Sequence, residues 1–223
     1  MKVLLALCLC LALPVRAEEL QLSVMARSTT HEDIWKVVET AAQRIGMKAV
    51  VREVSPERSA VLANAGSTDG DVGRSSGLEK EYPNLVRVPE PVYHYAPTVF
   101  SYKKLELVPG WEGIRGHTIC IRRGLRQTEL HSRGMQRQVL NDEAAILRML
   151  QAGGCEIAVM DRNNGAARRA MEADPPLQQF LPPLEVMPLY IYLNKKHAAL
   201  APRLAAALRQ MRADGTMHRL VGE

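Results

Sequence analysis

Asp161 and Thr128 follow two short β-rich runs, and their side chains suit the two ends of a zwitterion. Asp161 comes directly after residues 156–160, so its carboxylate can accept an ammonium group. Thr128 comes after residues 117–121 and a turn, and we expect its hydroxyl to cap the N-terminus of a helix. A helix that starts after a strand favours anions, because its free amides and its dipole both attract negative charge. One pocket edge thus offers an anion site beside a cation acceptor, the pair of groups that an amino acid needs.

The residues around these two positions leave more than one role open. Arg123 and Gln127 flank the predicted helix start, so both are candidates to contact the same ligand. Asp161 precedes the turn-forming residues 162–165, where an Asp commonly caps its own backbone. Asp161 is therefore either a ligand contact or a turn residue.

Arg74 is the candidate from the first half of the chain. It follows a predicted strand at residues 69–73, and a guanidinium group is the natural bidentate partner of a carboxylate. Arg74 could instead pair with Asp69 or Asp71 at the edge of the sheet. The sequence leaves both roles open.

The first half alternates strands and helices, which predicts an α/β sheet. The predicted strands are residues 20–25, 48–54 and 69–73, and the predicted helices are residues 31–45, capped by Thr30 with Asp33, and 56–66. Ligands of such sheets bind at the carboxyl ends of the strands. The serines that lie at these ends are candidate ligand contacts: Ser28, Ser55 and Ser75.

Later segments predict a second lobe and two connections. We expect Asn141 to cap a helix that ends at Gly153. Residues 85–102 are β-rich but contain three prolines, so we expect this run at a sheet edge or between domains. Residues 186–193 would cross back, before a final helix at residues 201–213. Two crossings allow bending, which is the basis of closure around a ligand.

Several of these segments together resemble family-3 bacterial extracellular solute-binding proteins, the periplasmic amino-acid-binding components of ABC transporters. The resemblance is carried by Arg123-Gly124, Thr128, residues 150–153 (LQAG) and residues 157–161 (IAVMD), and by residues 69–74, 82–91 and 189–221. It covers nearly the whole chain after residue 17. The family's Thr-x-x-Arg arrangement after the third strand is missing, and Arg74 comes several residues early, which leaves the ligand class open.

The resemblance implies an α/β fold with two lobes, the type-2 periplasmic binding protein fold, joined by two crossing strands. Residues 18–95 would begin the first lobe, residues 96–188 would form the second, and residues 189–223 would return to the first. In the family, an arginine near Arg74 binds the ligand's carboxylate and an Asp matching Asp161 takes its amino group. The expected partners are a small amino-acid-like ligand and an ABC permease or a membrane sensor, with no cofactor and no metal, and the expected state is a monomer.

Residues 1–17 predict a cleavable signal peptide. A positive start precedes an apolar run at residues 3–13 that is too short to span a bilayer, and Ala17 ends an acceptable cleavage site. Neither Cys8 nor Cys10 follows a small residue, as a lipoprotein signal would require. We therefore expect a periplasmic protein without a lipid anchor.

Charge and cysteine content restrict the possible functions further. The net charge of +5 comes from Lys and Arg scattered among acidic residues, so nucleic-acid binding is disfavoured. An oxidising compartment permits Cys120 and Cys155 to pair. A parallel register would hold their Cα atoms beyond the limit of about 7 Å for a disulfide, so free buried thiols are the alternative.

Two other function classes remain as alternatives to transport. An enzyme on the same fold, resembling the periplasmic cyclohexadienyl dehydratases, would need a general acid or base, for which His94 and His117 are the inner histidines available. A receptor domain would pass its closed state to a separate partner. No paired-carboxylate motif, Ser-His-Asp order or phosphate loop stands out, so we expect no enzyme activity.

Overall fold

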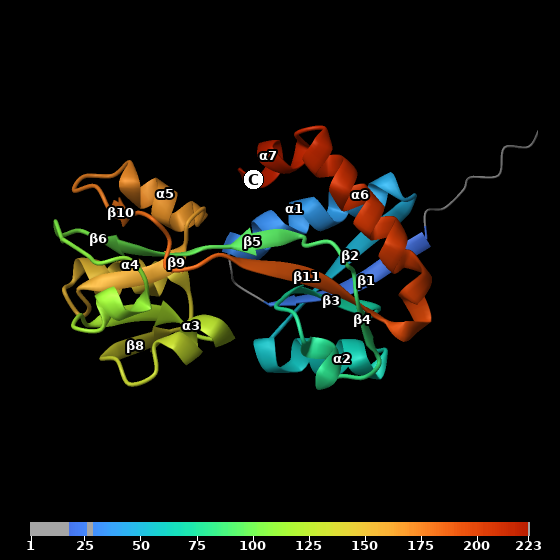
Figure 1. Ribbon diagram of the computed structural model, residues 1–223, viewed down its shortest axis with the longest axis horizontal. Coiled ribbons are helices and arrows are strands. Elements are labelled where there is room, and N and C mark those ends of the chain that lie inside the picture. The colour runs from blue at the N-terminus through green and yellow to red at the C-terminus, as the bar shows by residue number, and fades with distance from the viewer. Residues whose placement is uncertain (1–17, 26–28, 223) are drawn as a thin grey trace, which may run out of the picture.

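Two α/β lobes lie side by side and are joined by two connecting segments in the computed structural model, which describes residues 18–25 and 29–222 (Figure 1). The predicted signal peptide, residues 1–17, lies outside the described residues. Within the described part of the chain, no helix is long and apolar enough to cross a bilayer.

The first lobe is built on a mixed sheet whose strands run in the order β2-β1-β3-β11-β4, with β5 also paired to β11. These strands are β1 (Glu18–Met25), β2 (Met47–Val54), β3 (Gly70–Arg74), β4 (Leu85–Arg87), β5 (Tyr93–Tyr95) and β11 (Met187–Asn194). The first three are parallel, and β11 runs antiparallel to its neighbours. The carboxyl ends of β1 and β3 therefore meet at one edge of this sheet.

Helices cover both faces of the first sheet. They are α1 (Thr29–Arg44), α2 (Pro56–Ala65), α6 (Ala201–Ala213) and α7 (Thr216–Val221), with short 3-10 turns η1 (Leu78–Lys80) and η3 (Lys195–Leu200). Helix α1 packs against α6 and α7, while α2 packs on the other face (Figure 1). Four apolar residues of α1 are buried because their spacing places them on one side of the helix: Ile34, Val38, Ala41 and Ala42.

The second lobe is built on a sheet in the order β10-β6-β9-β7-β8. These strands are β6 (Pro97–Ser101), β7 (Ile119–Arg122), β8 (Arg137–Leu140), β9 (Ile157–Asp161) and β10 (Gln178–Phe180). The helices are α3 (Arg126–His131), α4 (Glu143–Gln151) and α5 (Gly165–Met171), with a 3-10 turn η2 (Trp111–Ile114). Strands β7, β8 and β9 are parallel, so the ends of β7 and β9 face the same side.

Two predicted helix caps are wrong by one or more residues. Helix α1 begins at Thr29, so Thr30 lies inside the helix and is not its N-cap. Helix α4 is capped by Asp142, whose Oδ1 accepts a hydrogen bond from the Ala145 amide at 2.7 Å. Asn141 instead accepts a bond from Arg123 Nε at 3.1 Å. Two adjacent residues could each cap this helix, and the carboxylate takes the position.

Cys120 and Cys155 form a disulfide, with Cα atoms 5.8 Å apart. The expectation that strand register separates them is wrong. Cys155 does not extend the line of β9; it lies in the turn that leads from α4 into the strand. Because α4 packs on this face of the sheet, the turn brings Cys155 over Cys120, and both join one buried cluster.

Two segments connect the lobes. One runs from β5 to β6, and the other runs from residue 181 into β11. Ala96 alone separates β5 of the first sheet from β6 of the second. Residues 85–102 were expected at a sheet edge or between domains; the run does connect the two sheets, but β6 within it is not an edge strand, since it lies between β10 and β9. Pro97 is its first residue, where a missing amide interrupts no inner part of the ladder. The return segment ends in β11, which pairs with β5 from Met187 to Leu189.

Candidate functional site

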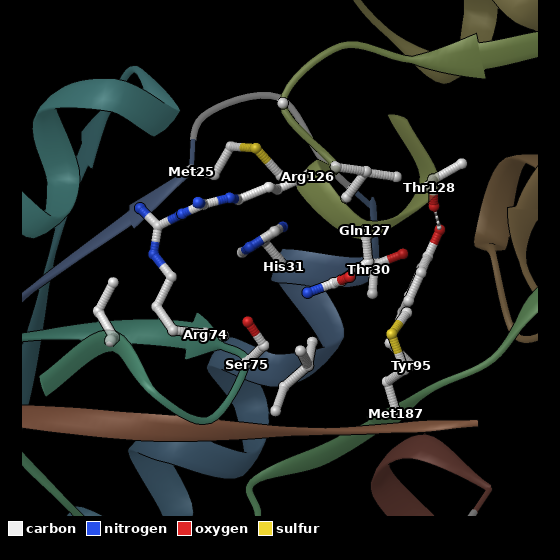
Figure 2. Close-up of a pocket in the computed structure, with 15 residues that line it drawn as sticks. Met25, Thr30, His31, Arg74, Ser75, Tyr95, Arg126, Gln127, Thr128 and Met187 are labelled. Carbon is white, nitrogen blue, oxygen red and sulfur yellow. Dashed lines mark hydrogen bonds between the residues drawn. The ribbon is translucent and has the colours of Figure 1, made fainter. Parts of the chain in front are cut away.

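A cavity of about 120 Å³ lies between the lobes, where the strand ends of both sheets face each other. The first lobe contributes Met25, Thr30, His31, Gly73, Arg74, Ser75 and Leu78, and the second contributes residues 124–128. Tyr95, Met187 and Leu189 line it from the two connecting segments. Figure 2 shows these side chains converging from separate elements. Any movement of one lobe relative to the other must therefore change the cavity.

Arg74 contributes a guanidinium group that is fixed from behind by Asp71. The Arg74 Nε to Asp71 Oδ2 distance is 2.7 Å, and Asp71 is fully buried. Asp71 also accepts hydrogen bonds from Ser59 Oγ at 2.5 Å and from the Val72 amide at 2.9 Å. Burial raises the pKa of Asp71, against the opposing effect of Arg74. The sequence left open whether Arg74 pairs with Asp69 or with Asp71, and the pairing with Asp71 is confirmed. The paired arginine still lines the cavity (Figure 2).

Thr128 lines the cavity but does not cap a helix. Helix α3 begins at Arg126, so Thr128 is inside it, fully buried, and the N-cap expectation is wrong. The N-cap position belongs to Leu125, with no side-chain cap, and Glu129 Oε1 accepts a hydrogen bond from the Gly124 amide in the preceding turn at 2.7 Å. The Thr128 hydroxyl instead lies 3.3 Å from the Tyr95 hydroxyl, across the boundary between lobe and connecting segment (Figure 2). Burial raises the pKa of Tyr95, so its phenol stays protonated.

His31 lies in the cavity wall and was missed by the sequence reasoning. Its side chain belongs to the first turn of α1, and the residue is 8% exposed. Its Nδ1 has no hydrogen-bond partner among the described atoms. Gly73, at φ +78°, lets the ring approach closely, since a Cβ there would lie 3.1 Å from His31 Nε2. The available signal was position alone: the first turn after β1 lies at the ligand-binding edge of such a sheet.

The charge around His31 is positive on the cavity side. Burial, followed by the charges of Arg122 and Arg74, lowers the pKa of His31 to about 3. Arg122 ends β7, is 3% exposed, and forms an ion pair with Glu143 at 3.4 Å. Its Nη1 also reaches across the lobes to Met25 Sδ at 3.5 Å. At neutral pH the ring is therefore uncharged beside two guanidinium groups.

Arg126 extends the positive side of the cavity to its exposed rim. Its side chain is exposed, and its Nη1 lies 3.5 Å from Glu81 of the first lobe. This ion pair joins the two lobes next to the cavity. Because both side chains are exposed, we expect it to contribute little to stability.

Asp161 is buried and holds the connecting segment. It is 3% exposed and accepts hydrogen bonds from Tyr93 Oη at 2.7 Å, from the Asn163 amide at 2.9 Å and from the Ala96 amide at 3.2 Å. It does not line the cavity. The turn-capping role is thus present, while the contact with a ligand's amino group stays a prediction.

The remaining predicted residues divide between the cavity and the surface. Gln127 and Ser75 line the cavity. Arg123 is exposed and bonded to Asn141, and Ser55 is exposed at the start of α2; neither lines the cavity. Ser28 lies outside the described residues.

The two histidines considered for an enzyme do not line the cavity between the lobes. His94 and His117 are absent from the described lining, and His117 Nδ1 lies 2.7 Å from Glu156 Oε2. Within residues 18–25 and 29–222, no group of three His, Cys, Asp or Glu side chains is placed to hold a metal ion.

Comparisons by sequence find no relative: no family model and no curated protein matches the chain. Comparison of structures finds many. A mutant of ArgBP from T. maritima superposes with a TM-score of 0.69 at 15% identity, covering 91% of this chain and 93% of that one. A histidine kinase sensor domain similar to periplasmic binding proteins gives 0.71 at 19% identity, covering 92% and 95%.

The fold is that of a type-2 periplasmic binding protein. The substrate-binding protein of an amino acid ABC transporter matches in the same way, with a TM-score of 0.66 at 13% identity, covering 91% of this chain and 97% of that one. The matches extend over both lobes and both connections. At these identities the agreement is one of fold.

Proposed function

We propose that the protein captures a small polar solute, an amino acid or a related compound, between its lobes in the periplasm and presents the closed form to an ABC permease. One observation carries this proposal: a single cavity is lined by both lobes and by both connecting segments. Ligand contacts made by both lobes stabilise the closed arrangement over the open one, which is the requirement for ligand-driven closure. Structures similar in fold include ancestral arginine-binding proteins bound to arginine and to glutamine.

In this proposal the ligand is held by Arg74 and Ser75 from the first lobe and by Gln127 and Thr128 from the second. Arg74 offers charge-assisted hydrogen bonds, and its pairing with Asp71 fixes the direction of the guanidinium group before the ligand arrives. A side chain that is already ordered loses less entropy on binding. Asp161 lies at the connection between the lobes and accepts a hydrogen bond from Tyr93, so closure of the lobes would act on this contact.

A ligand screen with two readouts tests the proposal. Amino acids and organic acids are added singly, and the melting temperature and the radius of gyration are measured. The right solute raises the first by linkage and lowers the second by closure. A broad screen in which no compound changes either quantity would refute solute binding.

Paired arginine variants then test the site. Arg74→Gln should weaken binding of the ligand found by about 2 to 5 kcal/mol, since it removes a charged contact in a closed site. Arg123→Gln is the matched control, because Arg123 is exposed and outside the cavity lining. Equal affinities for the two variants would exclude Arg74 from ligand binding.

A sensor role is the second candidate, supported by the histidine kinase sensor domain, which gives the higher TM-score of the two structures first compared. The two roles differ in what the closed form does. If the protein serves transport, deleting its gene abolishes uptake of the radiolabelled ligand by cells. If it serves sensing, uptake is unchanged and the transcriptional response to the ligand is lost.

A further inference from the structure

The polar groups that line the cavity have an unequal balance of charge. Among the described lining residues there are two arginines, Arg74 and Arg126, and one histidine, but no Asp or Glu. The carboxylates that pair with the arginines, Asp71 and Glu81, are not in the lining. Guanidinium groups therefore contribute to the cavity wall while their counter-charges lie behind or beside it.

His31 adds a buried ring nitrogen without a partner. The ring is more than nine-tenths buried and lines the cavity (Figure 2), and its Nδ1, which is closed to water in this arrangement of the lobes, has no partner among the described atoms. A buried polar nitrogen left unpaired is costly, and a carboxylate oxygen that accepts from it would remove this cost. A protonated amine could not do so without bringing a cation beside Arg74 and Arg122.

We propose that the solute is an anion, a small carboxylate of net negative charge whose oxygen accepts a hydrogen bond from His31 Nδ1, and that solutes with a basic side chain are excluded. This inference rests on the proposed function and names its ligand class. Two guanidinium groups with no carboxylate in the described wall attract negative charge and repel positive charge. In this arrangement of the lobes the cavity has a volume of about 120 Å³, which suits a small molecule.

The charged groups on each side of the His31 ring agree with this assignment. Arg74 of β3 lines the cavity and Arg122 of β7 does not, and both disfavour the charged imidazole. Behind the ring, a neighbouring cavity of about 320 Å³ shares His31 and is lined by Glu32 of α1 and Glu53 of β2. Beyond Arg122 lies its ion-pair partner Glu143 of α4. An anion in the first cavity would compensate the arginines and favour a proton on His31.

The first test compares three amino acids of similar size and different charge, with a dicarboxylate. L-glutamate, L-glutamine, L-arginine and succinate are titrated calorimetrically at pH 7 and equal ionic strength, followed by the members of a wider panel grouped by net charge. The tightest binder should be an anion, and L-arginine should bind at least about a hundredfold more weakly. If the tightest binder is neutral or cationic, this inference is wrong while solute binding stands. If nothing binds, the proposed function fails as well.

The second test asks whether His31 recognises the anion. His31→Leu should weaken binding of the tightest anion by about tenfold or more, as for a lost hydrogen bond to a charged group. His31→Asn should restore most of the affinity, because the amide nitrogen can take the place of Nδ1. His218→Asn is the control, since His218 is exposed on α7. Melting temperatures of the unliganded variants show whether each one is folded.

A purely structural role for His31 predicts a different result. Loss of packing would weaken an anion and its neutral amide analogue equally. Loss of the donor should weaken binding of the anion more than binding of the amide. The affinity for the anion is expected to rise between pH 7.5 and 5.5, by at most about tenfold per pH unit for one proton, and loss of the donor should reduce this rise. Equal losses for both ligands in His31→Leu, or failure of His31→Asn to restore affinity in a folded protein, would overturn the assignment.

Discussion

Reduction of the Cys120–Cys155 disulfide should destabilise the second lobe by an amount that follows from its loop. The two residues are 35 positions apart, and the chain-entropy relation gives about 4 kcal/mol at 25 °C for a loop of this length. With a urea slope of about 2 kcal/mol per molar, this lowers the midpoint of unfolding by about 2 M. Both half-cystines lie in one buried cluster of the second lobe, so the effect belongs to that lobe.

The chain provides its own reporters for this measurement. It has two tryptophans, and each lies in a different lobe: Trp35 packs against the core of the first and Trp111 against a core cluster of the second. Fluorescence of a Trp35→Phe variant therefore reports the second lobe, and that of Trp111→Phe reports the first. Reductant should lower the urea midpoint that Trp111 reports by about 2 M, and the midpoint that Trp35 reports by less.

Two results would refute this reasoning. If peptide mapping of the unreduced protein shows no link between Cys120 and Cys155, the bond is absent. If mapping shows the link but reductant leaves the Trp111 midpoint unchanged, the bond does not restrict the unfolded chain. The Cys120→Ala, Cys155→Ala double variant is the control, because reductant should not affect it.

Three further predictions concern the buried charges around the cavity. Asp71→Asn should lower the stability of the unliganded protein by about 3 kcal/mol, because Arg74 loses a buried partner; a change under about 0.5 kcal/mol in urea unfolding would contradict this. The pKa of His31 is lowered to about 3 in the folded protein, so below about pH 6.5 the unfolded state binds a proton that the folded state does not. The free energy of unfolding of the unliganded protein should therefore fall as the pH falls, by up to ~1.4 kcal/mol per pH unit. Urea midpoints between pH 7.5 and 5 measure this slope, which His31→Asn should reduce; an unchanged slope would show that other groups cause it. Glu143→Gln should destabilise by about 3 kcal/mol by leaving Arg122 without its buried ion-pair partner, and a neutral result in the same assay would mean that other contacts of Arg122 suffice.

The alternation of strands and helices along the chain was readable from the sequence, because burial repeats along one element. The runs that became β1, β3, β7 and β9 were recognised as strands, and the two-lobed arrangement was what the family resemblance implied. The connection between the lobes could be anticipated for a different reason: proline-containing runs between two α/β patterns rarely form central strands. Pro97 shows the limit of that rule, since a first position in a strand tolerates proline anywhere in a sheet.

The site was readable only in part, because competing neighbours decide local details. Thr128 was found, but it does not cap a helix, because α3 begins two residues earlier. Arg74 was found, and its partner Asp71 was one of two alternatives. His31 was not found, because nothing in its local sequence distinguishes it. Its significance comes from Gly73 and the arginines that approach it from other strands.

The position of β11 determines the order in which the lobes can fold. The second sheet uses strands from β6 to β10, one continuous stretch that is complete at Phe180. The first sheet has β11 between β3 and β4, so it lacks an inner strand until residue 194 has been added. Such distant pairing is slow to form. The lobe that holds the first strand is therefore the last to be completed, and a chain that stops before residue 187 should contain a folded second lobe attached to an unfinished first one.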